Sequence, residues 1–323
     1  DYKLLSFANN RPYVDKRDNK PCKYSIHSYF FDNPYFIHIF EKSSKHPESM
    51  IELPEAITIG KQVQDTLVNL TITEVLGPTH LHKFTFFNSD PNLFRDLLVG
   101  KQIKSAEGKG IFVDIRLSDN TFLSIFDGIN MKYAGPNTEI PDKYQLLITF
   151  DNDTFISFTT RMYGGIYVFK DSFDNKYRTQ SLESISPLCE EFNQAYFEEL
   201  ISKEKKDISA KALLASEQRI PGVGNGVLQD ILFNAGIHPK RKIFSLSDRE
   251  KSNLFQALKN TLQAMTDGGG RDTESDFFGN KGKYKTILSK NTYGMSCPHC
   301  NDKIHKDAYM GGSVYFCPTC QKL

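Results

Sequence analysis

The sequence predicts an α+β protein of several domains, and three observations along its 323 residues support this. Segments between residues 72 and 170 alternate apolar and polar side chains and are separated by short turns, a pattern typical of antiparallel strands. Residues 187–270 show the apolar spacing of helices instead. Two C-x2-C pairs near the C-terminus have metal-binding spacing. We therefore expect a sheet domain, a helical domain and a small metal-binding domain.

The composition is that of an ordinary globular protein, with 39% hydrophobic residues, 24% charged residues and a formal net charge of +1. No apolar run has membrane-spanning length, and no secretory signal is visible at the N-terminus. Charge is unevenly spread, because residues 281–323 contain seven lysines and two aspartates, a local charge of +5. Such a segment suits phosphate contacts, although a solvated surface explains it equally well on charge alone.

The first 49 residues differ in character from the rest. They contain five Phe and five Tyr, scattered among Asn, Lys and Pro without lasting strand or helix periodicity. Met50 then opens the sequence MIELPEA, which resembles a true start. We interpret residues 1–49 as an extension outside the native fold, translated from upstream sequence or from a misassigned start. The alternative is a small accessory segment that packs on the body.

A helix is expected over residues 55–69, at the start of a domain that spans residues 50–171. Pro54 stands near the first turn, and Glu52 and Glu55 stand at the positive end of the helix, where acids are stabilising. One apolar face follows at helical spacing. Its residues are Ile59, Val63 and Leu67.

The strand patterns lie in the same domain and are separated by turns such as 118–120 and 151–153. The clearest strands are residues 111–117, 121–126, 145–150 and 154–159. Alternation with short connections predicts an antiparallel β-sandwich. Residues 172–186 are polar and mixed in charge, which indicates a linker to the helical domain.

The helical domain, residues 187–270, is organised around the sequence IPGVGNG at 220–226. A helical pattern at 208–218 precedes this turn and an apolar helix follows it. Unpaired N–H groups and the dipole of the second helix predict an anion site, for which a phosphate is the obvious ligand. An ordinary glycine turn between packed helices is the alternative. Three glycines, 268–270, end the last long helix.

The strongest chemical signal lies in the last domain, residues 290–323. The two C-x2-C pairs are separated by sixteen residues and consist of Cys297, Cys300, Cys317 and Cys320. Four thiolates at this spacing predict one tetrahedral, structural Zn²⁺ without an open coordination position. Redox thiols are a weaker alternative, because the intervening sequence is basic and rich in turns. The cysteine pattern argues against a disulfide framework and implies a reducing cytoplasm.

These motifs together resemble the formamidopyrimidine-DNA glycosylase/endonuclease VIII family. The family's helix–two-turn–helix element carries a G-V-G-N turn and a helix that ends in A-G-I-H-P, here residues 235–239. The family also begins with M-P-E-L-P-E, which residues 50–55 resemble. The resemblance covers residues 50–323. It implies an N-terminal β-sandwich with flanking helices, a helix–two-turn–helix domain and a C-terminal zinc-finger β-hairpin.

The resemblance implies a base-excision repair enzyme that removes oxidised bases from DNA and also cleaves abasic sites. In the family an N-terminal proline amine attacks C1′ of the damaged nucleotide and forms a Schiff base, and the adjacent Glu transfers the proton. Glu52 takes the position of that catalytic Glu, and Glu55 takes that of the second acid. The amine would belong to Ile51 or Met50. Ile51 stands where the family has proline, which is a departure at the nucleophile.

The resemblance also implies a set of DNA-contacting residues. They are Lys109, Ile129, Arg161, Tyr163, Lys211, Gly224 and Asn225. Ile129 would insert into the gap left by a flipped base, and Arg161 and Tyr163 belong to a loop that fills the same gap. Two further departures occur: Met162 replaces an arginine of that loop, and Gly312 replaces the finger arginine that grips phosphates. Taken singly, Ile129 is also explained as a core side chain, Tyr163 as a strand aromatic, and Lys109 and Lys211 as surface charges.

The implied partner is double-stranded DNA that contains damaged bases or abasic sites. The resemblance implies a monomer without membrane contacts, in a bacterial cytoplasm at the nucleoid. One alternative is a damaged-DNA-binding protein of the same fold with impaired catalysis, because the proline and the finger arginine are absent. Another is a zinc-containing structural or RNA-binding protein, which leaves the ELPE and GVGN sequences unexplained.

Overall fold

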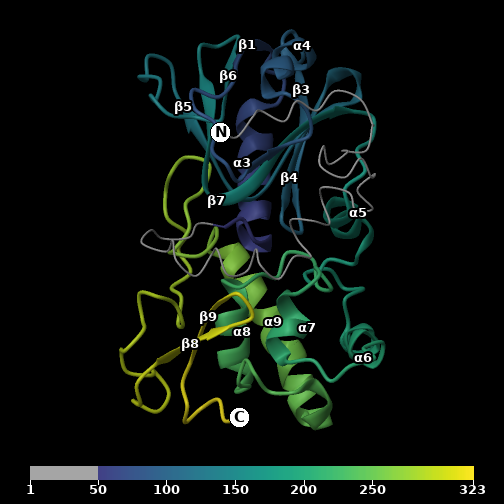
Figure 1. Cartoon of the computed structure of the whole chain (residues 1–323), viewed down its shortest axis with the longest axis vertical. Coiled ribbons are helices and arrows are strands. Elements are labelled where there is room, and N and C mark those ends of the chain that lie inside the picture. The colour runs from purple at the N-terminus through teal and green to yellow at the C-terminus, as the bar shows by residue number, and fades with distance from the viewer. Residues whose placement is uncertain (1–49) are drawn as a thin grey trace, which may run out of the picture.

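The computed structural model describes residues 50–323, so the interpretation of residues 1–49 lies outside the described part of the chain. Figure 1 shows a sheet domain at one end of the long axis and a helical domain with the C-terminal hairpin at the other. Within the described residues, no helix is both long and apolar enough to cross a membrane.

The first helix of the described chain is α3, Leu53–Leu67, which begins two residues before the predicted start. Pro54 lies in its first turn, and the Glu52 backbone N–H donates to the Glu55 carboxylate at 3.3 Å. The predicted apolar face is confirmed, because Ile59, Val63 and Leu67 are all buried. The sequence ELPE therefore does begin a helix, with acids at its positive end.

The strands form one seven-stranded sheet, of which six follow the order β1-β6-β7-β5-β4-β3 and β2 pairs with β7. The predicted antiparallel arrangement is confirmed; only the β2–β7 pair is parallel. Strands β5 and β7 are much longer than predicted and pair along most of their length, with a bulge between Asp127 and Ile129. The strands are β1 (Ile72–Leu76), β2 (Thr85–Phe87), β3 (Ile103–Lys109), β4 (Phe112–Leu117), β5 (Thr121–Ala134), β6 (Leu146–Phe150) and β7 (Phe155–Lys170).

Helix α3 lies between the two ends of this sheet, with β1 and β6 on one side and β3 and β4 on the other (Figure 1). The main core accordingly combines apolar residues of α3 with residues from both ends of the sheet. Short helical segments connect the strands: η1 (Pro91–Leu93), α4 (Phe94–Leu98) and η2 (Ser118–Asn120).

The segment predicted as a linker contains a helix, α5, Lys176–Glu183. Asn175 caps it by accepting from the Arg178 backbone N–H at 3.0 Å, and the Arg178 guanidinium donates to Asp114 of β4 at 2.6 Å. The polar composition that suggested a linker is instead explained by a cap and by an ion pair to the sheet.

The helical domain contains α6 (Gln194–Ser202), α7 (Ala210–Ala215), α8 (Val227–Ala235), η3 (Ile243–Ser245) and α9 (Asp248–Asp267). Helix α7 is shorter than the predicted 208–218, because Ser209 caps its start and the chain reaches positive φ at Glu217 and Gln218. Helix α9 ends at the glycines as predicted. Strands β8 (His305–Tyr309) and β9 (Gly312–Phe316) form the C-terminal hairpin, whose small core includes Phe233 of α8.

Candidate active site

Glu52, at the start of α3, places its carboxylate against the start of α8. One oxygen accepts from the Gly226 N–H at 2.8 Å, and the other accepts from the Val227 N–H at 2.7 Å. Only 2% of Glu52 is exposed. The predicted anion site at this helix start is therefore filled by the protein's own carboxylate, which corrects the expectation of a phosphate there.

The glycines of the turn are needed because the chain passes very close to this carboxylate. A Cβ atom on Gly224 would lie 2.6 Å from a carboxylate oxygen of Glu52. Gly222 has a φ of +81°, and its carbonyl accepts from the Leu53 N–H at 2.9 Å. The GVGNG turn thus holds the start of α3 against the start of α8, and Gly224 acts through this packing.

Arg271, which sequence reasoning missed, joins the same cluster from the loop after α9. Its Nε and Nη2 donate to the Glu55 carboxylate at 3.0 and 2.9 Å, and its backbone N–H donates to Glu55 at 3.0 Å. Its Nη1 lies 3.6 Å from the Glu52 carboxylate. The only sequence signal for this arginine was its position directly after the three glycines that end α9.

The charge state of Glu52 reflects opposing influences. Burial raises its pKa, and the neighbouring Glu55 carboxylate raises it further. The Arg271 guanidinium is the strongest influence that lowers the pKa, followed by the two N–H groups of α8. Glu52 is therefore a buried acid whose proton affinity depends on a single guanidinium and one helix start.

The two candidate amine positions lie beside this acid. The Ile51 N–H donates to the Asp127 carbonyl at 2.8 Å, and the Met50 N–H donates to the Glu274 carboxylate at 3.2 Å. Ile51 itself is buried in the main core. A backbone nitrogen at either position thus lies within the acidic cluster that contains Glu52.

Asp127 is a second residue that sequence reasoning missed. It lies at the β5 bulge with a φ of 61°, a conformation that is strained for a non-glycine residue. Burial raises the pKa of its carboxyl to about 8, a hydrogen bond from the Tyr163 hydroxyl lowers it, and the Glu52 charge raises it. Tyr163, predicted as a DNA-binding residue, is thereby connected to the candidate active site.

The other predicted DNA-binding residues of the sheet domain differ in how far they are exposed. Arg161 is exposed on β7. Lys109 is half-buried and donates to the Leu182 carbonyl of α5. Ile129 is 2% exposed and packs in the main core, so this structure does not present it as a wedge. Ile129 directly follows the β5 bulge that begins at Asp127.

Lys211 and Asn225 meet the tip of the C-terminal hairpin. The Lys211 ammonium donates to the Tyr309 carbonyl at 2.7 Å, and burial lowers the pKa of this lysine to about 8. The Asn225 side chain donates to the Ser313 carbonyl at 3.0 Å, while its buried side-chain oxygen has no hydrogen-bond partner. A Cβ atom on Gly312 would lie 3.4 Å from Asn225. The start of α7 and the GVGNG turn are therefore joined to the tip of the hairpin by hydrogen bonds.

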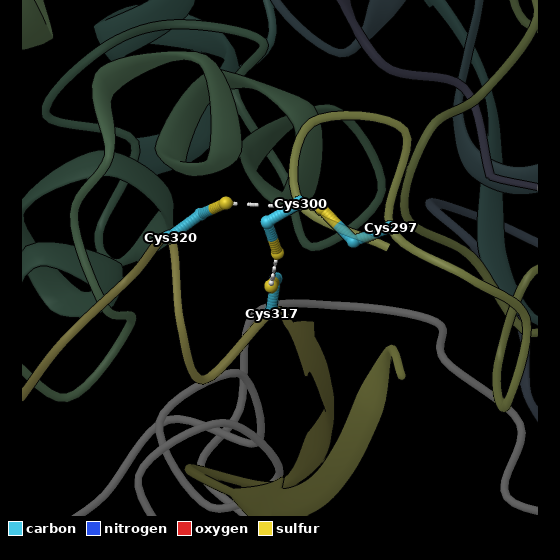
Figure 2. Close-up of side chains that lie close together, drawn as sticks. All are labelled: Cys297, Cys300, Cys317 and Cys320. Atoms are coloured by element: carbon cyan, nitrogen blue, oxygen red, sulfur yellow. Dashed lines mark hydrogen bonds between the residues drawn. The ribbon is translucent and has the colours of Figure 1, made fainter. Parts of the chain in front are cut away.

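The four predicted metal ligands converge, as Figure 2 shows. The sulfur atoms of Cys297, Cys300, Cys317 and Cys320 all lie within 4.8 Å of one another. The Cys297–Cys320 and Cys300–Cys317 sulfur distances are 3.8 and 3.4 Å. Sulfur ligands at about 2.3 Å from a tetrahedral ion are roughly 3.8 Å apart, so the four thiols suit one structural metal ion.

Comparison with known proteins places this architecture in a family. Residues 184–275 match the family model described as the formamidopyrimidine-DNA glycosylase H2TH domain. The chain is 30% identical over 285 residues to formamidopyrimidine-DNA glycosylase of Pelotomaculum thermopropionicum, covering 85% of this chain and all of that protein. It is 27% identical over 284 residues to the enzyme of the same name from Enterococcus faecalis, covering 85% and 98%.

Solved structures show the same fold. The MutM (Fpg) protein of Thermus thermophilus superimposes with a TM-score of 0.69 at 22% identity, covering 84% of this chain and 98% of that protein. Lactococcus lactis Fpg in complex with DNA that contains an abasic site gives a TM-score of 0.71 at 21% identity, covering 84% and 100%.

Proposed function

This chain belongs to the formamidopyrimidine-DNA glycosylase family, and on that basis we propose that it is a base-excision repair glycosylase acting on damaged duplex DNA. One observation carries the proposal: Glu52, which directly follows the candidate amine residues in the chain, is buried and its carboxylate is held by the start of α8. This is the arrangement that an amine-dependent glycosylase needs, because a proton must move next to the nucleophile.

The proposed reaction begins with a primary amine at the start of the body. Its nitrogen forms a bond to C1′ of the flipped nucleotide, while the bond between C1′ and the damaged base breaks. Glu52 takes the proton that the amine nitrogen loses when it bonds to C1′ and delivers it to the departing base. Loss of the sugar ring oxygen from C1′ then leaves a Schiff base, and elimination from this intermediate cleaves the strand at the abasic site.

A second part of this proposal concerns which residue carries the reactive amine. In a chain that begins at Met50, the free amine would lie near Glu274; in one that begins at Ile51, it would lie near the Asp127 carbonyl. Ile51 occupies the family's proline position and has a bulkier side chain, but a primary amine of either residue forms a Schiff base.

Duplex DNA would bind across both domains. Arg161 and Tyr163 would contact the opened base pair from the sheet domain, and Lys109 would approach the backbone near the flipped nucleotide. Lys211 and Asn225 would contact phosphates where the helical turn meets the finger tip. A similar structure that contains abasic-site DNA supports this choice of ligand.

The metal in this proposal is one zinc ion with a structural role. The four thiols leave no open coordination position, so such an ion takes no part in the reaction. Bound between the two C-x2-C pairs, it would hold the hairpin against α8.

A second candidate function is damaged-DNA binding without catalysis. It is favoured by two departures from the family, namely Ile51 at the nucleophile and Gly312 at the phosphate-binding position of the finger. Both functions predict preference for abasic over intact duplex, so binding alone does not separate them.

Chemical trapping separates the two functions. Borohydride reduces a Schiff base to a stable amine, so incubation of a protein begun at Met50 with abasic duplex should give a covalent complex. The full chain should trap far less, because residues 1–49 displace the free amine from the cluster.

A variant with Pro at position 51 and without Met50 serves as the positive control for the trapping experiment. If no form traps, this control included, the enzyme proposal fails and the binding function remains. If only the proline form traps, the fold is competent but the natural residues do not perform the reaction.

A further inference from the structure

We propose that Arg271 is a positioning residue of this active centre, whose guanidinium fixes Glu52 and Glu55 and supplies the positive charge that balances the surrounding carboxylates. The proposal rests on the proposed glycosylase function and names the residue on which the catalytic acid depends. It concerns the loop between α9 and the finger, which rises beside the sheet domain in Figure 1.

The geometry uses the whole guanidinium. Nε and Nη2 bind the Glu55 carboxylate in two parallel hydrogen bonds, and Nη2 also donates to the Met50 carbonyl at 3.3 Å. The remaining nitrogen, Nη1, faces Glu52. The side chain is 4% exposed, so water contributes little to its solvation. One residue thus contacts both acids and the backbone at the candidate nucleophile.

The turn before α8 is shaped to admit this guanidinium. A Cβ atom on Gly226 would lie 1.6 Å from Nη1 of Arg271. Glycine at this position therefore does more than complete the turn, because any side chain there would displace Arg271 from the start of α8. The GVGNG sequence and Arg271 form one packing unit, although 45 residues separate them.

The charges facing Glu52 are predominantly negative. Helix α3 contributes Glu55 and the β5 bulge contributes Asp127, while Glu274, in the loop after α9, faces the Arg271 guanidinium. Helix α8 contributes N–H groups and, farther along, the buried Asp230, whose charge Arg271 also offsets. Among the described residues, Arg271 is the cation that forms an ion pair with Glu52.

Two consequences follow for the proposed reaction. A neighbouring positive charge favours the ionised carboxylate, so Arg271 opposes the rise in the Glu52 pKa that burial causes. The same charge disfavours a second cation, so it also lowers the pKa of any amine at position 50 or 51. Both effects favour a neutral amine beside an ionised Glu52, the pair that must react.

The test uses three variants. Arg271→Met removes the charge at similar length, and Arg271→Lys keeps the charge but loses the paired hydrogen bonds. Because Arg271→Met leaves Glu55 buried without its partner, it can fail to fold. The double variant Glu55→Gln/Arg271→Met removes both members of the pair and serves in its place.

Arg178→Met is the matched control, since Arg178 is also largely buried and pairs with Asp114 at 2.6 Å, away from Glu52. It should lose stability as other buried arginine variants do, without changing the ionisation of the catalytic acid.

The first measurement is direct titration of Glu52 by carbon NMR, with labelled glutamate side-chain carboxyls and assignment by Glu52→Gln. The titration midpoint should rise by at least about one pH unit in Arg271→Met or the double variant, a tenfold change in proton affinity. It should return most of the way in Arg271→Lys and stay unchanged in Arg178→Met. An unchanged midpoint without the guanidinium would overturn the proposal.

The second measurement is the pH profile of borohydride trapping. The acidic limb should move to higher pH in Arg271→Met or the double variant, and return in Arg271→Lys. A uniform loss of trapping at every pH would show a merely structural role and contradict the proposal. If the protein begun at Met50 does not trap, the natural residues do not perform the proposed reaction, whereas the NMR titration still decides the role of Arg271.

Discussion

At the scale of single residues, Glu52 and Asp127 show how surroundings give two carboxyls different properties. Glu52 receives two N–H groups and faces a guanidinium, which favour its ionised form against burial. Asp127 receives the Tyr163 hydroxyl but no cation, and burial raises its pKa to about 8. Burial raises the pKa of both carboxyls, but only Glu52 has a guanidinium and two helix N–H groups that oppose the rise.

Asp127→Asn should change the pH dependence of stability. The native pKa lies above the unfolded value near 3.9, so this group's contribution is present below about pH 4 and is lost as pH rises toward 8. The variant should therefore gain stability relative to wild type between pH 4 and 8. Because Asp127 as a whole residue is half-buried, solvent screening reduces the effect, and we expect a gain of about 1–3 kcal/mol.

Urea unfolding of wild type and Asp127→Asn at pH 4, 6 and 8.5 measures this difference. A constant difference across the three pH values would show that Asp127 titrates as an ordinary exposed aspartate.

Glu52→Gln should abolish base excision by a factor of at least about 100, because the amide cannot transfer the proton. It should keep part of the trapping on a preformed abasic site, where the base is already gone. Single-turnover excision measures the effect, and Glu74→Gln, at an exposed position of β1, is the control. Equal excision by Glu52→Gln and wild type would remove Glu52 from the reaction.

At the scale of elements, the GVGNG turn joins α3 to α8 through a carboxylate rather than through apolar packing alone. The positive end of α8 is satisfied by Glu52, and the turn carbonyl of Gly222 is satisfied by the Leu53 N–H. Because each helix start binds the other, a change in the turn should affect both the position of the acid and the contact between domains.

Gly224→Ala tests this coupling. Its Cβ would approach a Glu52 oxygen to 2.6 Å and push the carboxylate away from the α8 N–H groups. We expect a loss of about 1–3 kcal/mol in unfolding free energy, the cost of disturbed buried hydrogen bonds, together with reduced excision. Gly135→Ala is the matched control, since nothing lies within 4 Å of its Cβ position. Equal stability of the two variants would show that the turn has room to adapt.

At the scale of the molecule, the finger is docked onto the helical domain by polar contacts around its tip. Gln229 of α8 donates to the Asn225 carbonyl and accepts from the Tyr315 N–H at 3.0 Å, and Lys211 and Asn225 donate to hairpin carbonyls. The metal cluster lies at the other end of the same hairpin. Lys211 and Asn225, the residues proposed to contact DNA, should therefore depend on the metal for their positions, although neither is a ligand.

Cys317→Ser should lose the metal and release the hairpin, because a finger of this size folds only around its ion. Binding to abasic duplex should weaken at least about tenfold, and its salt dependence should become shallower as phosphate contacts are lost. Metal analysis and fluorescence anisotropy at several salt concentrations measure both effects. Unchanged affinity in a metal-free protein would place the DNA contacts outside the finger and turn.

Features that depend on local spacing could be predicted from the amino-acid sequence. The family, the alternation of strands and helices, the start of α3, the glycine end of α9 and the four-cysteine cluster all arise from residues close together in the chain. Such features appear in the fold as predicted, because helix periods, strand periods and the spacing of ligands around one metal ion are properties of short stretches of chain.

The surroundings of Glu52, the proposed catalytic acid, follow instead from the packing of segments that are distant in the sequence. Glu52 meets α8 across 175 residues, and Glu55 meets Arg271 across 216. The burial of Ile129, the raised pKa of Asp127 and the contacts of Lys211 depend equally on which elements pack together. No local pattern encodes such contacts, since desolvation and charge at a site come from whichever distant segments close around it.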